Sequence, residues 1–186
     1  MRVWLASASQ RRCQWLNERL SHVECYALED IDESISRPTV SETVLEICQL
    51  KADTVPVNHG FDLVIVSDTL VEDPDDERKA LGKPMDKEKA LKMLLRIRGS
   101  THKVWTATGA LENGIWKFSL EHAVVKIDYF SDDVLVDLIE SESWKGKAGG
   151  YDLAGQMGTY ANLVKGSESV VLGLSIEPFK HHLRKT

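Results

Sequence analysis

Residues 61–69 read Phe-Asp-Leu-Val-Ile-Val-Ser-Asp-Thr, and they set the fold class expected for the chain. The run from Phe61 to Val66 predicts a strand that is buried on both faces. It continues directly into Ser67-Asp68-Thr69, and polar residues at the end of a buried strand are a common place for chemistry in α/β proteins. An aspartate that abuts a buried strand also needs a partner, so Asp68 is a candidate functional residue.

Strand and helix patterns alternate on both sides of this stretch. Strands are expected at 3–6, 22–28, 102–111, 115–129, 161–165 and 169–174; helices at 11–20, from about 41, and at 87–97, 131–140 and 176–184; a charged loop at 72–79 and a Gly-rich loop at 145–158. Asn113-Gly114 between two apolar runs predicts a hairpin. Because no repeat or linker is visible, the expectation is a single mixed α/β domain over residues 1–186.

Composition excludes several classes of protein. The net charge of −6 opposes binding to nucleic acid, and the N-terminus has too few apolar residues for a secretory signal or a membrane span. A cytoplasmic protein is therefore expected. The cysteines Cys13, Cys25 and Cys48 are odd in number and lack CxxC spacing, which favours reduced thiols over a disulfide frame or a zinc site.

The segment Leu-Ala-Ser-Ala-Ser-Gln-Arg-Arg at 5–12 predicts a small-residue turn between a strand and a helix, with Ser9 as the N-cap. Arg11 and Arg12 fall in the first helical turn, where cations oppose the helix dipole. An anion bound between them would account for this placement, since helix N-termini and guanidinium groups both bind phosphate. A solvated first turn is the equally weighted alternative.

Carboxylates and lysines supply the other candidates. Glu33, in the acidic loop segment Ile-Asp-Glu-Ser at 31–34, and Asp68 could provide oxygen ligands for a hard divalent cation, although acidic loop residues are usually only solvated. Lys51, Lys83 and Lys147 are each more often surface residues when taken alone. A triphosphate carries a charge of about −4, so an acidic protein can bind it only where several lysines or arginines lie close together beside a metal ion.

Two other features have structural interpretations. The Gly-rich stretch 147–155 allows close backbone approach to a ligand, but its spacing is not that of a Walker loop. His102 is expected to be a structural hydrogen-bonding residue, because no second histidine stands at ligand spacing.

In their order and spacing, several strings closely resemble the Maf family of nucleotide pyrophosphatases over residues 3 to about 176. They are LASASQRR at 5–12, Lys-Ala at 51–52, SDT at 67–69, GKP at 82–84, RGSTHKV at 98–104, KAGGY at 147–151 and VVLGL at 170–174. The resemblance implies an elongated mixed sheet flanked by helices, with a cleft between two lobes, similar to that of inosine triphosphate pyrophosphatases, and often a homodimer.

The resemblance also implies roles for particular residues. Water would attack the α-phosphorus of a nucleoside triphosphate and pyrophosphate would leave, assisted by Mg²⁺ or Mn²⁺. The catalytic positions are Asp68, Glu33, Lys51 and Lys83, with Asp68 and Glu33 as metal ligands. The substrate-binding positions are Ser7, Ser9, Arg11, Arg12, Thr69 and Gln156.

The resemblance indicates the preferred nucleotide base less directly than it indicates the reaction. The family divides into uridine or thymidine types and a 7-methylguanosine type, and Arg11 and Thr69 resemble the pyrimidine pattern. Ala154 departs from it, since glutamine is usual there, and Gln156 is the candidate replacement. Smaller departures are Gln10, where the family has proline, and Gly146, where it usually has aspartate.

Other classes of function lead to different tests. A regulatory binding protein in cell division or septum formation, a role historically associated with the family, would need no turnover. Its biological effect would survive Asp68→Asn while hydrolysis is lost. A nucleic-acid-binding protein is disfavoured by the acidic charge and would be retained on DNA at low salt.

Overall fold

The computed structural model describes residues 1–29, 31–153 and 155–183. Along the chain, the elements are β1 (Val3–Leu5), α1 (Gln10–Asn17), β2 (Val23–Cys25), α2 (Val40–Thr54), β3 (Leu63–Asp73), β4 (Asp76–Leu81), α3 (Lys87–Ile97), β5 (Thr101–Glu112), β6 (Ile115–Ile127), α4 (Asp132–Glu140), η1 (Ala148–Gly150), η2 (Gln156–Thr159), β7 (Ala161–Lys165), α5 (Glu168–Leu172) and η3 (Lys180–His182).

The strands form one mixed seven-stranded sheet in the order β2-β1-β3-β5-β6-β7, with β4 paired to β3. β1 is parallel to β2 and β3, whereas the other pairs are antiparallel. The expected hairpin between β5 and β6 is confirmed, and both turn residues, Asn113 and Gly114, have positive φ. This sheet confirms the mixed α/β class.

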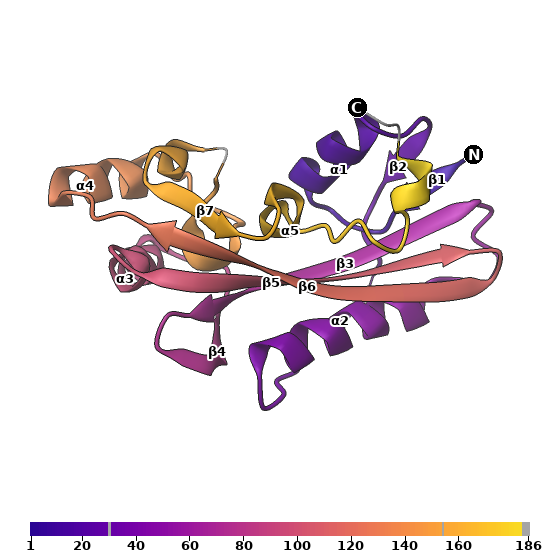
Figure 1. Cartoon of the computed structure of the whole chain (residues 1–186), viewed down its shortest axis with the longest axis horizontal. Coiled ribbons are helices and arrows are strands. Elements are labelled where there is room, and N and C mark those ends of the chain that lie inside the picture. Colours follow the sequence, from indigo (N-terminus) through magenta and orange to yellow (C-terminus); the bar gives the residue numbers. More distant parts are fainter. Residues whose placement is uncertain (30, 154, 184–186) are drawn as a thin grey trace.

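Helices cover both faces of the sheet, and its three longest strands run along the molecule (Figure 1). β3 is buried on both faces, as predicted. Leu63 and Ile65 pack with α1 and the C-terminal segment, whereas Val64 and Val66 pack against α2. A third core lies at the other end of the sheet, where α3 and α4 pack against β5, β6 and β7.

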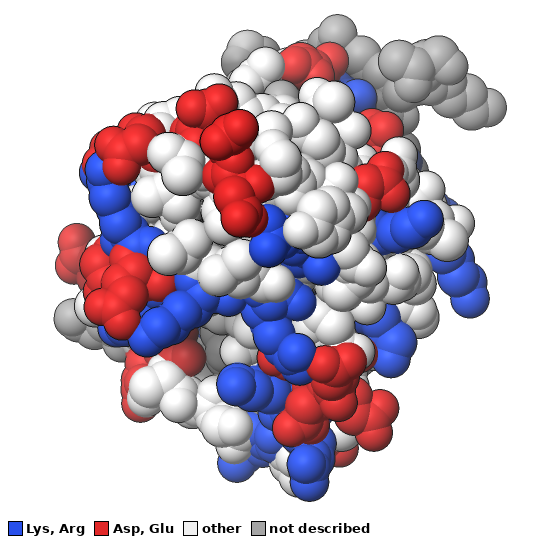
Figure 2. Space-filling model, turned by 90° about the vertical axis from the view of Figure 1, so that its left-hand side faces the viewer, with Lys and Arg blue, Asp and Glu red and all other residues white. Residues whose placement is uncertain are grey.

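The end of the molecule that carries α3 and α4 has a mixed charge pattern. Basic and acidic side chains are interspersed on this face (Figure 2). Several of them form exposed ion pairs, including Lys87–Glu140 and Lys92–Glu88. Within the ranges the structure describes, no helix is both long and apolar enough to cross a membrane.

The prediction of a charged loop at 72–79 is wrong. β3 continues through Ser67-Asp68-Thr69 to Asp73 and turns into β4, so these polar residues lie inside a strand and not at its end. The buried carboxylates of Glu72 and Asp73 are tolerated because they have partners. Trp105 Nε1 donates to Glu72 over 2.7 Å, and Arg96 donates to Asp73 from two nitrogens.

Two predictions near the C-terminus are also wrong. Residues 169–174 do not form a strand; α5 occupies Glu168–Leu172 and ends at Gly173, which has a φ of 111°. Polar side chains of the sheet hold this turn, because Thr106 Oγ1 donates to Val170 O and Ser67 Oγ donates to Gly173 O. In place of the helix expected at 176–184, only η3 is formed; residue 184 lies outside the described residues.

Cys13 and Cys25 form a disulfide, contrary to the expectation of reduced thiols. Packing of α1 beside β2 brings their Cα atoms to 6.0 Å, a proximity that neither the cysteine count nor their spacing in sequence reveals. Cys48 is a free, buried thiol, as expected. The disulfide joins α1, whose first turn carries Arg11 and Arg12, to the edge of the sheet.

Candidate functional site

Arg12 is the centre of a polar cluster between α1 and β3. Ser9 caps α1 and accepts from the Arg12 backbone N–H. The guanidinium donates to Ser7 Oγ over 3.3 Å, to Ser67 O over 3.2 Å and to Thr69 Oγ1 over 2.9 Å. Burial lowers the pKa of Arg12, and the nearby carboxylate of Asp68 opposes this effect. The predicted turn therefore places a half-buried cation against the middle of β3.

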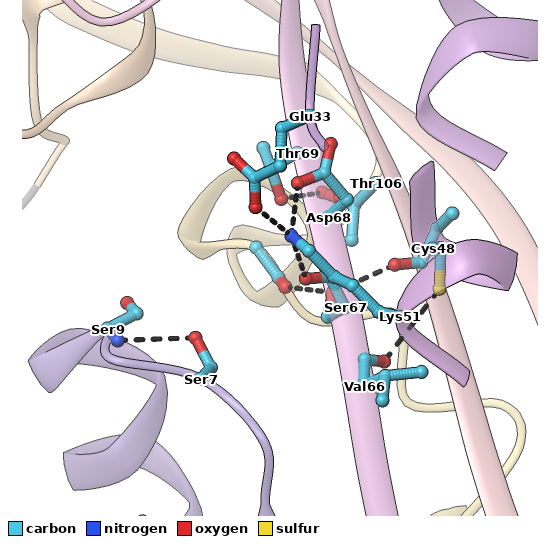
Figure 3. A network of polar contacts seen from close by, with 12 residues as sticks. Ser7, Ser9, Glu33, Cys48, Lys51, Val66, Ser67, Asp68, Thr69 and Thr106 are labelled. Carbon is cyan, nitrogen blue, oxygen red and sulfur yellow. Dashed lines mark hydrogen bonds and ion pairs between the residues drawn. The ribbon is translucent and has the colours of Figure 1, made fainter. Parts of the chain in front are cut away.

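A second cluster lies beside it, where Lys51 of α2 reaches the same strand (Figure 3). Lys51 Nζ lies 2.8 Å from Asp68 Oδ1 and 2.7 Å from Glu33 Oε1. The Lys51 and Asp68 side chains are only 11% and 12% exposed, whereas that of Glu33 is 51% exposed. The structure thus brings together an ammonium group and two carboxylates from distant parts of the chain.

Glu33 is ionised more readily than an ordinary glutamate. Burial raises the pKa of its carboxyl, but a hydrogen bond from Lys51 and the charges of Lys51, Lys83 and Arg12 lower the pKa below its usual value.

Lys83 makes no hydrogen bond or ion pair with any residue in the described part of the chain, so its ammonium group is available to a ligand.

Two atoms in these clusters are buried without a protein partner. Among the described residues, Asp68 Oδ2 and Arg12 Nε are buried and make no hydrogen bond. Leaving such groups unsatisfied costs about 1–3 kcal/mol each, more if they are charged. Because one is an anionic acceptor and the other a cationic donor, a ligand that carries both a cation and an anion matches the pair.

Gly173 and Thr106 complete the surroundings of Arg12, and the sequence did not indicate their roles. Thr106 Oγ1 lies 2.9 Å from Thr69 Oγ1 and so holds the acceptor of the Arg12 guanidinium. A Cβ atom at Gly173 would lie 2.6 Å from Arg12 Nε. The sequence marks Gly173 only as the glycine of the VVLGL string, and nothing in that string shows that it lies against Arg12.

The GKP and KAGG segments also lie together. Gly149 N donates to Gly82 O over 3.1 Å, immediately before Lys83. Arg11 does not join Arg12, since its guanidinium lies 3.2 Å from Asp152 Oδ1. Asp152 also lies 3.4 Å from Lys147 Nζ. Asp152 therefore links α1 to the Gly-rich segment, a role that the sequence did not predict.

Some candidates lie outside these clusters. The side chain of Gln156 accepts from Ser141 Oγ at the C-cap of α4 and makes no described contact with the clusters. Asp32 accepts from Ser34 in its own loop. Ala154, the position that departs from the pyrimidine pattern, lies outside the described residues.

His102 is structural, as expected. Its Nε2 lies 2.7 Å from the Tyr151 hydroxyl, and burial lowers its pKa to about 4. This ring therefore stays neutral at physiological pH. Cys48 is close to Lys51 and Asp68, but burial raises the pKa of its thiol to about 12, so it is not a nucleophile at neutral pH.

Known proteins resemble this chain over nearly its whole length. The dTTP/UTP pyrophosphatase of Pyrococcus furiosus is 31% identical over 175 residues, which cover 94% of this chain and 90% of that protein. The dTTP/UTP pyrophosphatase of Pyrococcus horikoshii is 32% identical, with 95% and 92% covered. That of Desulforamulus reducens is 29% identical, with 98% and 95% covered.

The solved structure of the Staphylococcus aureus Ham1 protein aligns with 68% of this chain and 72% of its own, at 14% identity and a TM-score of 0.46. The family model for Maf-like protein matches residues 2–186. This chain belongs to the Maf family.

Proposed function

We propose that this protein is a nucleoside triphosphate pyrophosphatase that releases pyrophosphate and a nucleoside monophosphate. The observation that carries the proposal is the convergence of Arg12, Lys51, Asp68 and Glu33, with a buried donor and a buried acceptor left unpaired. The relatives named dTTP/UTP pyrophosphatase support the same reaction class.

Division of labour in the site follows from charge. Arg12, Lys51 and Lys83 would bind the phosphates, and Ser7 and Ser9 would hold Arg12 and the α1 N-terminus in position. Lys51 is already paired with Asp68 and Glu33. A polyphosphate that reaches Lys51 therefore has to compete with at least one of these carboxylates.

A divalent cation fits the two carboxylates. Asp68 Oδ2 is a buried oxygen without a partner among the described residues, and Glu33 is held in its ionised form. Such oxygen donors suit Mg²⁺ or Mn²⁺, and Asp68 and Glu33 would hold it. The cation would neutralise charge that develops on the phosphate oxygens. In the proposed reaction, a carboxylate also orients the water that attacks the α-phosphorus.

For the base, we propose dTTP and UTP as the first substrates to test. The relatives carry these names, and Arg11 and Thr69 match the pyrimidine pattern. Here, however, Thr69 is hydrogen-bonded to Arg12 and Arg11 is paired with Asp152. Gln156 would have to leave Ser141 to contact a base.

A substrate panel tests the reaction. Purified protein is mixed with Mg²⁺ or Mn²⁺ and UTP, dTTP, CTP, 7-methyl-GTP or modified pyrimidine triphosphates, and pyrophosphate and orthophosphate are measured separately. We expect pyrophosphate to be released, and we expect this release to stop when a chelator removes the divalent cation. No release from any nucleotide would reject the proposal.

The variant Asp68→Asn tests the site. We expect it to lower kcat/KM at least roughly 100-fold, about 2.7 kcal/mol of transition-state stabilisation. Asp76→Asn is the matched control, because it makes the same change of charge at a carboxylate of β4 that pairs with Arg78 at the surface. Equal activity of the two variants would remove Asp68 from the mechanism.

Homodimer formation, which the family resemblance implies, and a cytoplasmic location, which the composition favours, stay predictions. Light scattering coupled to gel filtration measures the oligomeric state directly.

A further inference from the structure

Glu112, His181 and His182 form a cluster at the other end of β3 from the active-site candidates. Glu112 ends β5 at the β5–β6 hairpin, and the histidines belong to η3. Glu112 pairs with Leu63 across the sheet. Leu63 is five residues before Asp68 on β3, which corresponds to roughly 17 Å. The cluster is therefore separate from the site described above.

The ligand atoms of the three side chains converge. Glu112 Oε2 lies 3.1 Å from His181 Nε2, and Oε1 lies 2.8 Å from His182 Nε2. Each of the three residues offers one ligand atom, and these atoms all lie within 4.8 Å of one another. Among the described residues, no other set of three or more histidine, cysteine, aspartate or glutamate side chains meets this criterion. Ligands of a tetrahedral Zn²⁺ with bonds of about 2.0–2.1 Å stand roughly 3.3 Å apart. The 3.1 Å separation is close to this value, and the 2.8 Å separation is shorter, so a bound ion would move Glu112 and His182 slightly apart.

One of these nitrogens lacks a hydrogen bond. His182 Nε2 is buried and has no hydrogen-bond partner within the described ranges, although Glu112 Oε1 is close. The short distance without hydrogen-bond geometry leaves a nitrogen that a cation between the two groups would satisfy. A simple ion pair would be expected to align an N–H with the carboxylate.

The ligand set of this cluster differs in kind from that of Asp68 and Glu33. Imidazole nitrogens favour Zn²⁺, Cu²⁺ or Ni²⁺, whereas carboxylates alone favour Mg²⁺ or Mn²⁺.

We propose that Glu112, His181 and His182 bind a transition-metal ion, with Zn²⁺ as the expected occupant. The site ties the C-terminal turn to the β5–β6 hairpin and leaves a coordination position for water or an external ligand. It is independent of the proposed hydrolysis, since none of its residues belongs to the clusters around Arg12 and Lys51.

Calorimetric titration with Zn²⁺ tests the site in protein that carries no histidine tag. The Asp68→Asn, Glu33→Gln background is used, with excess Mg²⁺, so that the carboxylate pair does not contribute. We expect one equivalent to bind with a Kd of about 1 μM or tighter, and Co²⁺ to give the visible absorption of a tetrahedral site.

His181→Gln and Glu112→Gln should each weaken Zn²⁺ binding at least tenfold. His181 is 49% exposed, so its variant is expected to fold even if His182→Gln does not, and circular dichroism checks this. His122→Gln, at a half-buried histidine of β6 that stands opposite Trp105, seven residues from Glu112 along β5, is the matched control and should bind as the parent does. Absence of stoichiometric binding, or equal binding by His181→Gln and the control, would overturn the proposal.

Discussion

Gly173→Ala is expected to reduce activity without removing any side chain from the site. Gly173 has a φ of 111°, in the region that residues with a Cβ rarely adopt. Its added Cβ would stand 2.6 Å from Arg12 Nε and 2.7 Å from Nη2. Both separations are shorter than van der Waals contact, so either the guanidinium or the α5 turn has to move.

The size of the effect follows from what Arg12 is proposed to do. Strain in the left-handed region costs about 1–2 kcal/mol in stability. Displacement of the guanidinium removes a hydrogen bond to a charged group, which is worth about 1.5–3 kcal/mol. At 1.4 kcal/mol for each factor of ten, kcat/KM should fall roughly 10- to 100-fold.

Steady-state pyrophosphate release measures this loss, and thermal unfolding measures the stability. Gly60→Ala is the matched control, since Gly60 also has a positive φ, of 72°, but a Cβ there would meet no atom within 4 Å. It should lose stability and keep activity. In an Arg12→Ala background, Gly173→Ala should have little further effect. If Gly173→Ala retains kcat/KM within about twofold of Gly60→Ala, Arg12 does not depend on this glycine as argued.

Three further predictions concern stability and reactivity. Burial lowers the pKa of His102 from an ordinary 6.5 to about 4, so the unfolded state takes up a proton first as the pH falls. The free energy of unfolding should therefore drop by about 3 kcal/mol between pH 6.5 and pH 4. Urea unfolding should show a flatter dependence on pH for His102→Gln than for the parent. Reduction of the Cys13–Cys25 disulfide, which closes a sequence separation of 12, should lower the free energy of unfolding by roughly 2–3 kcal/mol in the native chain but not in Cys13→Ser. Iodoacetamide should label Cys48 at pH 8 only in denaturant, because burial raises the pKa of its thiol to about 12, and labelling of the folded protein would contradict that burial.

Local sequence patterns predicted most of the fold. Hydrophobic spacing located α2, α3 and α4, and Asn113-Gly114 located the β5–β6 hairpin. These elements were predictable because a helix face or a two-residue turn depends on neighbours in sequence.

Errors occurred where distant residues decide the structure. β3 extends through charged residues because Trp105 and Arg96 satisfy Glu72 and Asp73. The sequence 169–174 has strand-like composition, yet Thr106 and the sheet hold it as α5. The disulfide likewise depends on the packing of α1 beside β2. None of these contacts leaves a local signal.

For the site, motif order identified Arg12, Lys51 and Asp68, which the structure brings together. Their contacts could not be read from the sequence, nor could the supporting roles of Thr106 and Gly173. Arg11 shows the limit of motif reasoning, because its pairing with Asp152 joins residues far apart in the chain.

The pairing of Glu33 with Lys51 has a consequence for how a ligand would enter. Lys51 and Asp68 are fixed by a helix and a central strand, whereas Glu33 lies in residues 31–37, which form neither helix nor strand. Local opening costs least where the backbone lacks such hydrogen bonds. An incoming polyphosphate could thus displace Glu33 from Lys51 while Lys51 and Asp68 keep their positions. Ligand entry then requires the movement of one short segment, residues 31–37, and no rearrangement of the helix and strand that carry the other two residues.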